Sequence, residues 1–176
     1  MEKIFLETER LYLREIACSD FDDLKDMLQD TEVMYAWEYT FSDAEVSEWI
    51  DKNLARYKTS GLGYFIAVDK ITGRVAGQAA LMPDIINNNR FYEIGYILKK
   101  QYWHKGYAAE CARALAEYAF NELNLDKVIF EIRPENMPSR RVAEKLGAKI
   151  EGEFIKRVKD KDMRHLIYGL SNGFCV

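Results

Sequence analysis

Residues that break or cross-link a chain are scarce in this sequence. It contains three prolines and ten glycines among 176 residues, so no stretch has the composition of a flexible linker. The three cysteines, Cys18, Cys111 and Cys175, are scattered and form no CxxC pair, which argues against a disulfide framework or a zinc site. We expect Cys111 to pack in the core, and the set as a whole suits a reducing cytoplasm.

Long apolar runs and a secretion-type N-terminus are also missing. The first residues, MEKIFLETERL, contain no apolar segment of signal-peptide length, and no later run is as long as a membrane span. The net charge of −4 differs from the basic balance of most nucleic-acid-binding proteins. We therefore expect one domain over residues 1–176, with a core from about 8 to 172, that binds neither nucleic acid nor membrane.

Negative charge is concentrated between residues 20 and 51. This acidic segment holds eleven acids against one base, Lys25. The acids are Asp20, Asp22, Asp23, Asp26, Asp30, Glu32, Glu38, Asp43, Glu45, Glu48 and Asp51. Because the whole chain has a charge of only −4, the remainder must be net positive.

The stretch from residue 92 to 109 carries the most information. An apolar strand runs into a short basic loop, and a helix with an apolar stripe begins at Gly106. Such a loop presents free backbone N–H groups at the positive end of a helix dipole, which predicts a site for a phosphate-bearing ligand. Three lysines add positive charge around it: Lys99, Lys100 and Lys105. The loop is neither a Walker loop nor a dinucleotide fingerprint, because GxxxxGK[ST] and GxGxxG are both absent.

The loop resembles the one with which the GNAT superfamily of N-acetyltransferases holds the pyrophosphate of acetyl-coenzyme A. That loop reads [QR]-x-x-G-x-[GA], and this chain has QYWHKGYA over residues 101–108. Three other segments are similar to the branch that contains the ribosomal-protein N-terminal acetyltransferases. They are TERLYLR (8–14), EIGYIL (93–98) and NMPSRRV (136–142), the last continuing to EKLG (144–147). The likeness extends over nearly the whole chain.

The resemblance implies an α/β (α+β) fold with a mixed, mostly antiparallel sheet of about seven strands flanked by helices. Periodicity places strands near 11–16, 64–69, 74–82, 91–98, 127–133, 149–158 and 163–170. Helices are expected at about 20–28, after the capping box at Ser42, from Gly106, and between Asn136 and Gly147. A loop is expected at residues 87–89. In the family the fourth and fifth strands splay apart, and coenzyme A enters the gap with its pantetheine arm along the fourth.

The resemblance also implies the residues that hold acetyl-coenzyme A, the co-substrate. They are Ile97, Leu98, Gln101, Trp103, His104, Lys105, Gly106, Tyr107, Ala108, Ala109 and Asn136. His104 stands where the family has glycine, and it can keep the N–H contact to phosphate if its φ is negative. The aromatic residues of the loop are expected to pack it or to shield the ligand. Asn136 can cap a helix and bind the pantetheine amide at the same time.

Attack of an amine on a thioester needs a base, because a free alkyl ammonium group has a pKa of about 10. Glu93, the one acid in its apolar strand, is the candidate base, acting directly or through water; the alternative is a structural carboxylate. For the proton donor to the thiolate, the resemblance points to Ser139, which could equally be an ordinary first-turn serine. The family's usual tyrosine is replaced by Ala143. Tyr168 is another possible donor, with a place in the core as the alternative.

Together these features predict a cytoplasmic acetyl-coenzyme A-dependent N-acetyltransferase that transfers the acetyl group directly to a primary amine. The resemblance suggests the N-terminus of a (ribosomal) protein as acceptor. The alternatives are a small amine such as a polyamine or an aminoglycoside-like compound, or a coenzyme A-binding module without catalysis. We expect no metal, a homodimer as in many such relatives, and a cationic acceptor, because the acidic segment would form one wall of the acceptor site.

Overall fold

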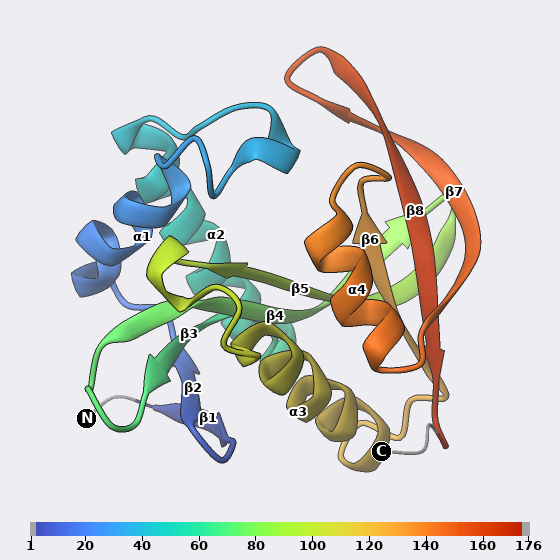
Figure 1. Cartoon of the computed structure of the whole chain (residues 1–176), viewed down its shortest axis with the longest axis horizontal. Coiled ribbons are helices and arrows are strands. Elements are labelled where there is room, and N and C mark those ends of the chain that lie inside the picture. Colours follow the sequence, from blue (N-terminus) through green and yellow to red (C-terminus); the bar gives the residue numbers. More distant parts are fainter. Residues whose placement is uncertain (1–2, 174–176) are drawn as a thin grey trace.

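The computed structural model describes residues 3–173, which form one sheet flanked by helices (Figure 1). The strands are β1 (Ile4–Glu7), β2 (Leu11–Glu15), β3 (Gly63–Asp69), β4 (Val75–Ile86), β5 (Asn89–Leu98), β6 (Lys127–Ile132), β7 (Lys149–Val158) and β8 (Lys161–Ser171). The helices are α1 (Phe21–Leu28), α2 (Asp43–Ser60), α3 (Tyr107–Asn121) and α4 (Met137–Lys145), with 3-10 turns η1 (Cys18–Asp20), η2 (Tyr35–Trp37) and η3 (Lys100–Tyr102).

The strands lie in the order β1-β2-β3-β4-β5-β6-β8-β7, and all neighbours are antiparallel except β5 and β6. The expected fold is therefore confirmed, with β1 as an addition to the seven predicted strands. β1 is four residues long, and its apolar residues follow one another without alternating with polar ones, so this segment has no strand periodicity.

The sheet splits between β5 and β6. These two strands share a single bridge pair, Glu93 with Ile129, and then diverge (Figure 1). They are the fourth and fifth of the strands predicted from the sequence, so the expected splay is confirmed. The gap beyond the bridge pair is where the candidate site lies.

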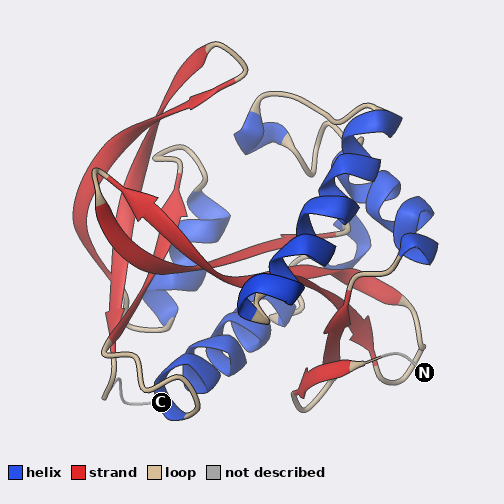
Figure 2. Cartoon of the chain, turned by 180° about the vertical axis from the view of Figure 1, so that it is seen from behind, coloured by secondary structure: helices blue, strands red, loops and turns tan. Residues whose placement is uncertain are grey.

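Each face of the sheet is covered by a different pair of helices. Seen from behind, α2 crosses one face with α1 beside it, while α3 and α4 cover the other (Figure 2). Leu115 and Ala116 of α3 are fully buried in one core, and Val46 and Ile50 of α2 are buried in the second. β3 is buried along its whole length because it lies between the two cores. No helix in residues 3–173 is long and apolar enough to cross a membrane.

Two local predictions can be compared directly with the structure. The capping box before α2 is confirmed: the Ser42 hydroxyl accepts the Glu45 N–H at 3.3 Å, and the Glu45 carboxylate accepts the Ser42 N–H at 2.8 Å. The loop expected at residues 87–89 is a tighter two-residue turn. Asn87 and Asn88 have φ of +48° and +63°, typical of the type I′ turns that join hairpin strands. β4 consequently continues four residues beyond its predicted end.

Candidate active site

The loop before α3 has free N–H groups, as an anion site requires. Within the described residues, the backbone N–H groups of 104–109 donate no hydrogen bond to another backbone or side-chain group. Gly106, the N-cap of α3, has φ of +80°, and His104 has φ of +60°. The negative φ that would let His104 keep the N–H contact of the family's glycine is therefore not observed. The turn keeps the left-handed conformation that glycine adopts freely, at a cost for another residue of about 1–2 kcal/mol.

Two residues near the N-terminus, Thr8 and Arg10, hold the start of α3. Glu110, in the first turn, accepts the Thr8 hydroxyl at 2.5 Å and the Arg10 backbone N–H at 2.8 Å. The Arg10 guanidinium donates to Glu110 at 2.6 Å and to the Lys105 carbonyl at 2.8 Å. Its carbon centre also lies 4.6 Å from the centre of the Tyr107 ring. The T-x-R motif near the N-terminus thus fixes the anion loop and places a guanidinium beneath it.

Two of the three lysines expected around the loop belong to other contacts. Lys99 binds Asp23 and Asp26 of α1 at 2.6 and 3.3 Å, and Lys100 binds Glu32 at 2.5 Å. These ion pairs direct both ammonium groups toward the acidic segment, so the prediction that they add charge at the anion loop is wrong. Lys105 has no ion pair among the described residues and lies 5.1 Å from the centre of the Tyr102 ring.

The aromatic residues of the loop pack it against the core. The Tyr102 ring stacks on that of Tyr107 at 5.8 Å, and both side chains are buried. The Trp103 indole donates to the Leu98 carbonyl at 3.0 Å, and the Tyr107 hydroxyl donates to Asp69 at 2.5 Å. Four other residues predicted to bind the ligand lie between the end of β5 and the first turn of α3. They are Ile97 in β5, Gln101 in η3, and Ala108 and Ala109 in α3.

A cavity of about 250 Å³ occupies the gap between β5 and β6. Its floor is β5 from Glu93 to Ile97, and residues of β6, β7 and β8 form the opposite side. Trp37, Trp49 and Tyr64 supply an aromatic wall. A Cβ at Gly95 would lie only 2.8 Å from the Tyr64 hydroxyl, so any other residue here would have to displace that side chain.

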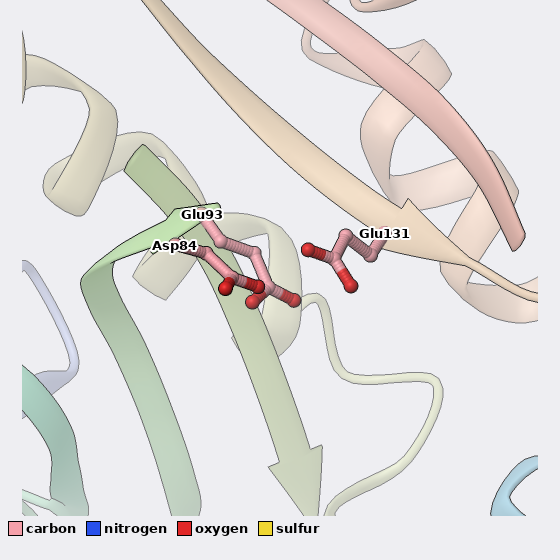
Figure 3. A group of neighbouring side chains, drawn as sticks. All are labelled: Asp84, Glu93 and Glu131. Atoms are coloured by element: carbon pink, nitrogen blue, oxygen red, sulfur yellow. The ribbon is translucent and has the colours of Figure 1, made fainter. Parts of the chain in front are cut away.

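Glu93 lines this cavity. It belongs to a cluster of three carboxylates (Figure 3). The cluster consists of Glu93 on β5, Asp84 on β4 and Glu131 on β6, with one oxygen of each within 4.8 Å of the others. Glu93 is 7% exposed, and its Oε2 atom has no hydrogen-bond donor among the described residues. An ion pair that would make Glu93 a purely structural residue is therefore not observed in the described chain.

Two basic residues act on this cluster. Lys156 of β7 donates to Glu131 at 2.7 Å, while Arg56 of α2 lines the cavity and has no ion pair among residues 3–173. Burial, with repulsion from Glu131, raises the pKa of Glu93, and Lys156 opposes the rise. Burial and the neighbouring Asp84 likewise raise the pKa of Glu131. Carboxylates are also ligands for hard cations, but the Lys156 ammonium already neutralises part of the charge here.

The start of α4 forms the other end of the cavity. Asn136 caps this helix, since its Oδ1 accepts the Ser139 N–H at 3.3 Å, and it also accepts the Tyr35 hydroxyl at 2.8 Å. Asn136 and Ser139 both line the cavity, so the capping role leaves the Asn136 amide nitrogen free for a ligand. The Tyr96 hydroxyl donates to the Ser139 carbonyl at 2.9 Å.

Two side chains considered from the sequence lie in the core instead. Tyr168 is 1% exposed, donates to Glu144 at 2.7 Å and accepts from Arg140 at 2.9 Å. It does not line the cavity, which fits its alternative as a core residue. Ala143 is fully buried in the same core. Cys111 is also buried there, and burial raises the pKa of its thiol to about 12. Cys175 lies outside the described residues.

The acidic segment does not form the wall expected of it. Seven of its acids, grouped by partner, pair with basic residues: Asp20 with Arg14, Asp23 and Asp26 with Lys99, Glu32 with Lys100, Glu38 with Arg133 and Lys161, Asp43 with Lys25, and Glu45 with Lys159. None of the eleven lines the cavity, where this segment contributes Ala36, Trp37 and Trp49. The acidic-wall expectation is wrong because amphipathic helices turn their acids outward or toward bases elsewhere.

Sequence reasoning missed the partners of Glu93. Glu131 was visible as the one acid in its apolar strand, as Glu93 was in its own. Asp84 was hidden because it lies beyond the predicted end of its strand at residue 82, whereas β4 continues through Pro83 to Ile86. Lys156 follows an alternating pattern on β7 that gave no sign of which face meets the gap.

These parts could work together on a ligand with a phosphate at one end. The anion loop would hold the phosphate, the gap between β5 and β6 would admit the rest, and Glu93 could take a proton at the far end. An amine that enters the cavity would then meet both a base and the end of the ligand. Such an arrangement suits group transfer to an amine.

Comparisons with known proteins agree with this geometry. A model of the acetyltransferase (GNAT) domain matches residues 10–149. The protein YkkB of Bacillus subtilis is 38% identical over 82% of this chain and 85% of its own, and the N-acetyltransferase YnaD of that organism is 32% identical over 86% of each. The crystal structure of a GNAT-family acetyltransferase from Bacillus anthracis superposes with a TM-score of 0.79 at 28% identity, covering 97% of this chain and 98% of its own. The chain therefore belongs to the GNAT family of acetyltransferases.

Proposed function

We propose that this protein transfers the acetyl group of acetyl-coenzyme A directly to a primary amine, with Glu93 as the base. The observation that carries the proposal is the buried Oε2 atom of Glu93, which has no donor among the described residues and lies in the cavity between the splayed strands. A buried carboxylate with a raised pKa is a better proton acceptor than an exposed one. The free backbone N–H groups of residues 104–109 are evidence for the proposed binding of the pyrophosphate at the other end of the site.

In this mechanism the ammonium group of the acceptor gives one proton to Glu93, and the neutral amine attacks the thioester carbonyl. The carbonyl oxygen becomes an oxyanion, which a backbone N–H can stabilise. The C–S bond then breaks, and the proton lost by the new amide reaches the departing thiolate. Ser139 is the proposed donor for that proton, because its hydroxyl belongs to a residue lining the cavity and has no partner among the described residues.

The acceptor is proposed to be a cationic amine. The support comes from Glu93 and Glu131, which line opposite sides of the cavity, and from Trp37 and Trp49, whose aromatic rings attract ammonium groups. Solved structures with the same fold include a spermidine N-acetyltransferase from Vibrio cholerae and a ribosomal-protein-S5-alanine acetyltransferase from Vibrio fischeri. At 20% and 23% identity they share the fold alone. A cavity of about 250 Å³ suits a small amine, or the first residue of a protein N-terminus.

The test is a thiol-release assay with N-terminal peptides and small amines as competing acceptors. We expect Glu93→Gln to lower kcat far more than it changes the KM for acetyl-coenzyme A. The deficit should shrink as the pH rises, because more of the acceptor is then already neutral. Glu117→Gln, on the exposed side of α3, is the matched control. Wild-type kcat at all pH values in Glu93→Gln would remove Glu93 from the mechanism, and binding without turnover on any amine would favour a non-catalytic module.

Binding of the co-substrate is tested separately at the loop. Gly106→Asp introduces a carboxylate next to the proposed pyrophosphate and removes the glycine from a position with φ of +80°. Calorimetry should show at least a tenfold loss of affinity for coenzyme A, which corresponds to about 1.4 kcal/mol. Unchanged affinity would place the site elsewhere.

Two further expectations complete the proposal. We propose a homodimer, for which light scattering of the purified protein is the direct measurement. The cytoplasm is the proposed compartment, because the exposed thiol of Cys18 stays reduced there.

A further inference from the structure

The carboxylate cluster of Asp84, Glu93 and Glu131 contains more negative charge than a single base requires. Its members come from three strands, β4, β5 and β6, and Figure 3 shows Glu131 directed across the gap toward the other two. One oxygen of each lies within 4.8 Å of the others. Two like charges this close do not both ionise readily in a buried site.

Two oxygens of the cluster have no donor. Glu93 Oε2 and Glu131 Oε1 are both buried without a hydrogen-bond partner among residues 3–173. The Glu93 residue is 7% exposed and the Glu131 side chain is 2% exposed. A buried acceptor without a donor destabilises the folded protein. Each of these oxygens can therefore accept a proton without losing an existing hydrogen bond.

Charged and titratable groups reach Glu93 from every element packed around it. Asp84 and Glu131 disfavour its ionised form, while Lys156 of β7 and Arg56 of α2 favour it. The Tyr64 hydroxyl of β3 also interacts electrostatically with Glu93 and Glu131. The Lys156 ammonium lies 2.7 Å from a Glu131 carboxylate oxygen, so it limits how strongly Glu131 repels a negative charge on Glu93.

We propose that Asp84 and Glu131 are positioning residues for the reaction base: their negative charge beside Glu93 makes it a stronger proton acceptor, and Lys156 limits this effect. This inference rests on the proposed function of Glu93. During turnover, the ammonium group of the acceptor loses one proton to a Glu93 oxygen. The neighbouring negative charges favour this transfer, and the proton leaves to solvent after the product departs, so no further reactant is needed.

The first experiment is the pH dependence of kcat/KM in Glu131→Gln, Asp84→Asn and Lys156→Met. Glu131→Gln and Asp84→Asn each remove a negative charge next to Glu93. The acid limb of the kcat/KM profile should therefore move to lower pH, by about one unit for Glu131→Gln. Lys156→Met removes the restraining charge, so the limb should move to higher pH. Glu117→Gln is the control for a remote change of charge. An unmoved limb in all three variants, or movement of all three in one direction, would overturn the inference.

The second experiment is independent of turnover. Carbon-13 NMR of the glutamate side-chain carboxyl groups gives the titration of Glu93 in the wild type and in each folded variant. Opposite displacements of the Glu93 titration in Glu131→Gln and Lys156→Met support the electrostatic coupling, and their absence overturns the inference. Displacements in NMR together with full activity of Glu93→Gln would instead refute the proposed base. Calorimetry with Mg²⁺ or Ca²⁺ is the last arm: micromolar binding lost in Glu131→Gln would show a metal site and overturn the inference.

Discussion

Glu110 provides a quantitative test of how the anion loop is held. Its carboxylate is 16% exposed and accepts from the Thr8 hydroxyl and from the backbone and guanidinium of Arg10. Glu110→Gln preserves the size of the side chain but turns one acceptor oxygen into a donor that faces other donors. A hydrogen bond to a charged group contributes about 1.5–3 kcal/mol, and the Arg10 side chain is 40% exposed. Loss of two such bonds, reduced for solvent screening at Arg10, predicts a destabilisation of about 2–3 kcal/mol.

The size of this loss should depend on pH. Burial opposes ionisation of Glu110, but the hydrogen bonds from Thr8 and Arg10 outweigh it and lower the pKa of Glu110 in the folded protein. A lowered pKa means that the ionised carboxylate stabilises the folded protein at any pH above the pKa of the unfolded chain, about 4.3. This stabilisation is lost as the pH falls through the lower pKa of the folded protein. The difference between wild type and Glu110→Gln is therefore full at pH 7 and narrows below about pH 4.

Thermal unfolding and acetyl-coenzyme A kinetics measure the two consequences. For a chain of this size, about 2–3 kcal/mol lowers the Tm by roughly 4–12 °C. The KM for acetyl-coenzyme A should rise as well, because Arg10 loses the partner that holds it under the loop. Glu117→Gln, two turns further along α3 and exposed, should change neither quantity. If Tm and KM are both unchanged in Glu110→Gln, the network does not hold the loop.

Three further predictions concern strain, charge and space. His104→Gly relieves a φ of +60°, so it should stabilise the fold by up to about 1 kcal/mol and tighten coenzyme A binding; weaker binding in calorimetry would show that the ring itself is a ligand. Asp20→Ala removes a buried partner of Arg14, held at 2.6 and 2.7 Å, and should cost about 3 kcal/mol or more in urea unfolding; a loss below about 1 kcal/mol would contradict this. Gly95→Ala should displace the Tyr64 hydroxyl and so raise the KM for the acceptor. Adding Tyr64→Phe should restore the wild-type KM. A KM that stays raised in the double variant would contradict a contact between the two residues.

The order of elements was predictable because most of them have strong local patterns. The Ser42 capping box, the apolar stripe of α3 and the strand from residue 92 each carry their own signal in a few neighbouring residues. β1 and the far end of β4 do not, because the pairing that creates them joins short segments across a turn. The tight Asn87–Asn88 turn extends β4 past a proline that would normally end a strand.

The site was predictable as far as single residues and spacing can indicate it. Glu93 was identifiable as an acid in an apolar strand, and the loop as a strand-to-helix turn. The side-chain contacts were not, because they depend on which residues meet across the sheet. Lys99 and Lys100 looked like anion ligands until α1 and Glu32 were placed beside them. Asp84 and Glu131 became partners of Glu93 only through the splay that brings three strands together.

The single bridge pair between β5 and β6 also bears on how long the protein survives in a cell. Beyond Glu93 and Ile129 the two strands present backbone edges to each other without pairing, so this is the weakest line through the sheet. A ligand that binds only the folded state and fills this gap stabilises it by RT ln(1 + [L]/Kd), about 2.7 kcal/mol at a hundredfold excess over Kd. Resistance to proteolysis should then follow the supply of coenzyme A, so that metabolic state sets the abundance of the enzyme as well as its rate.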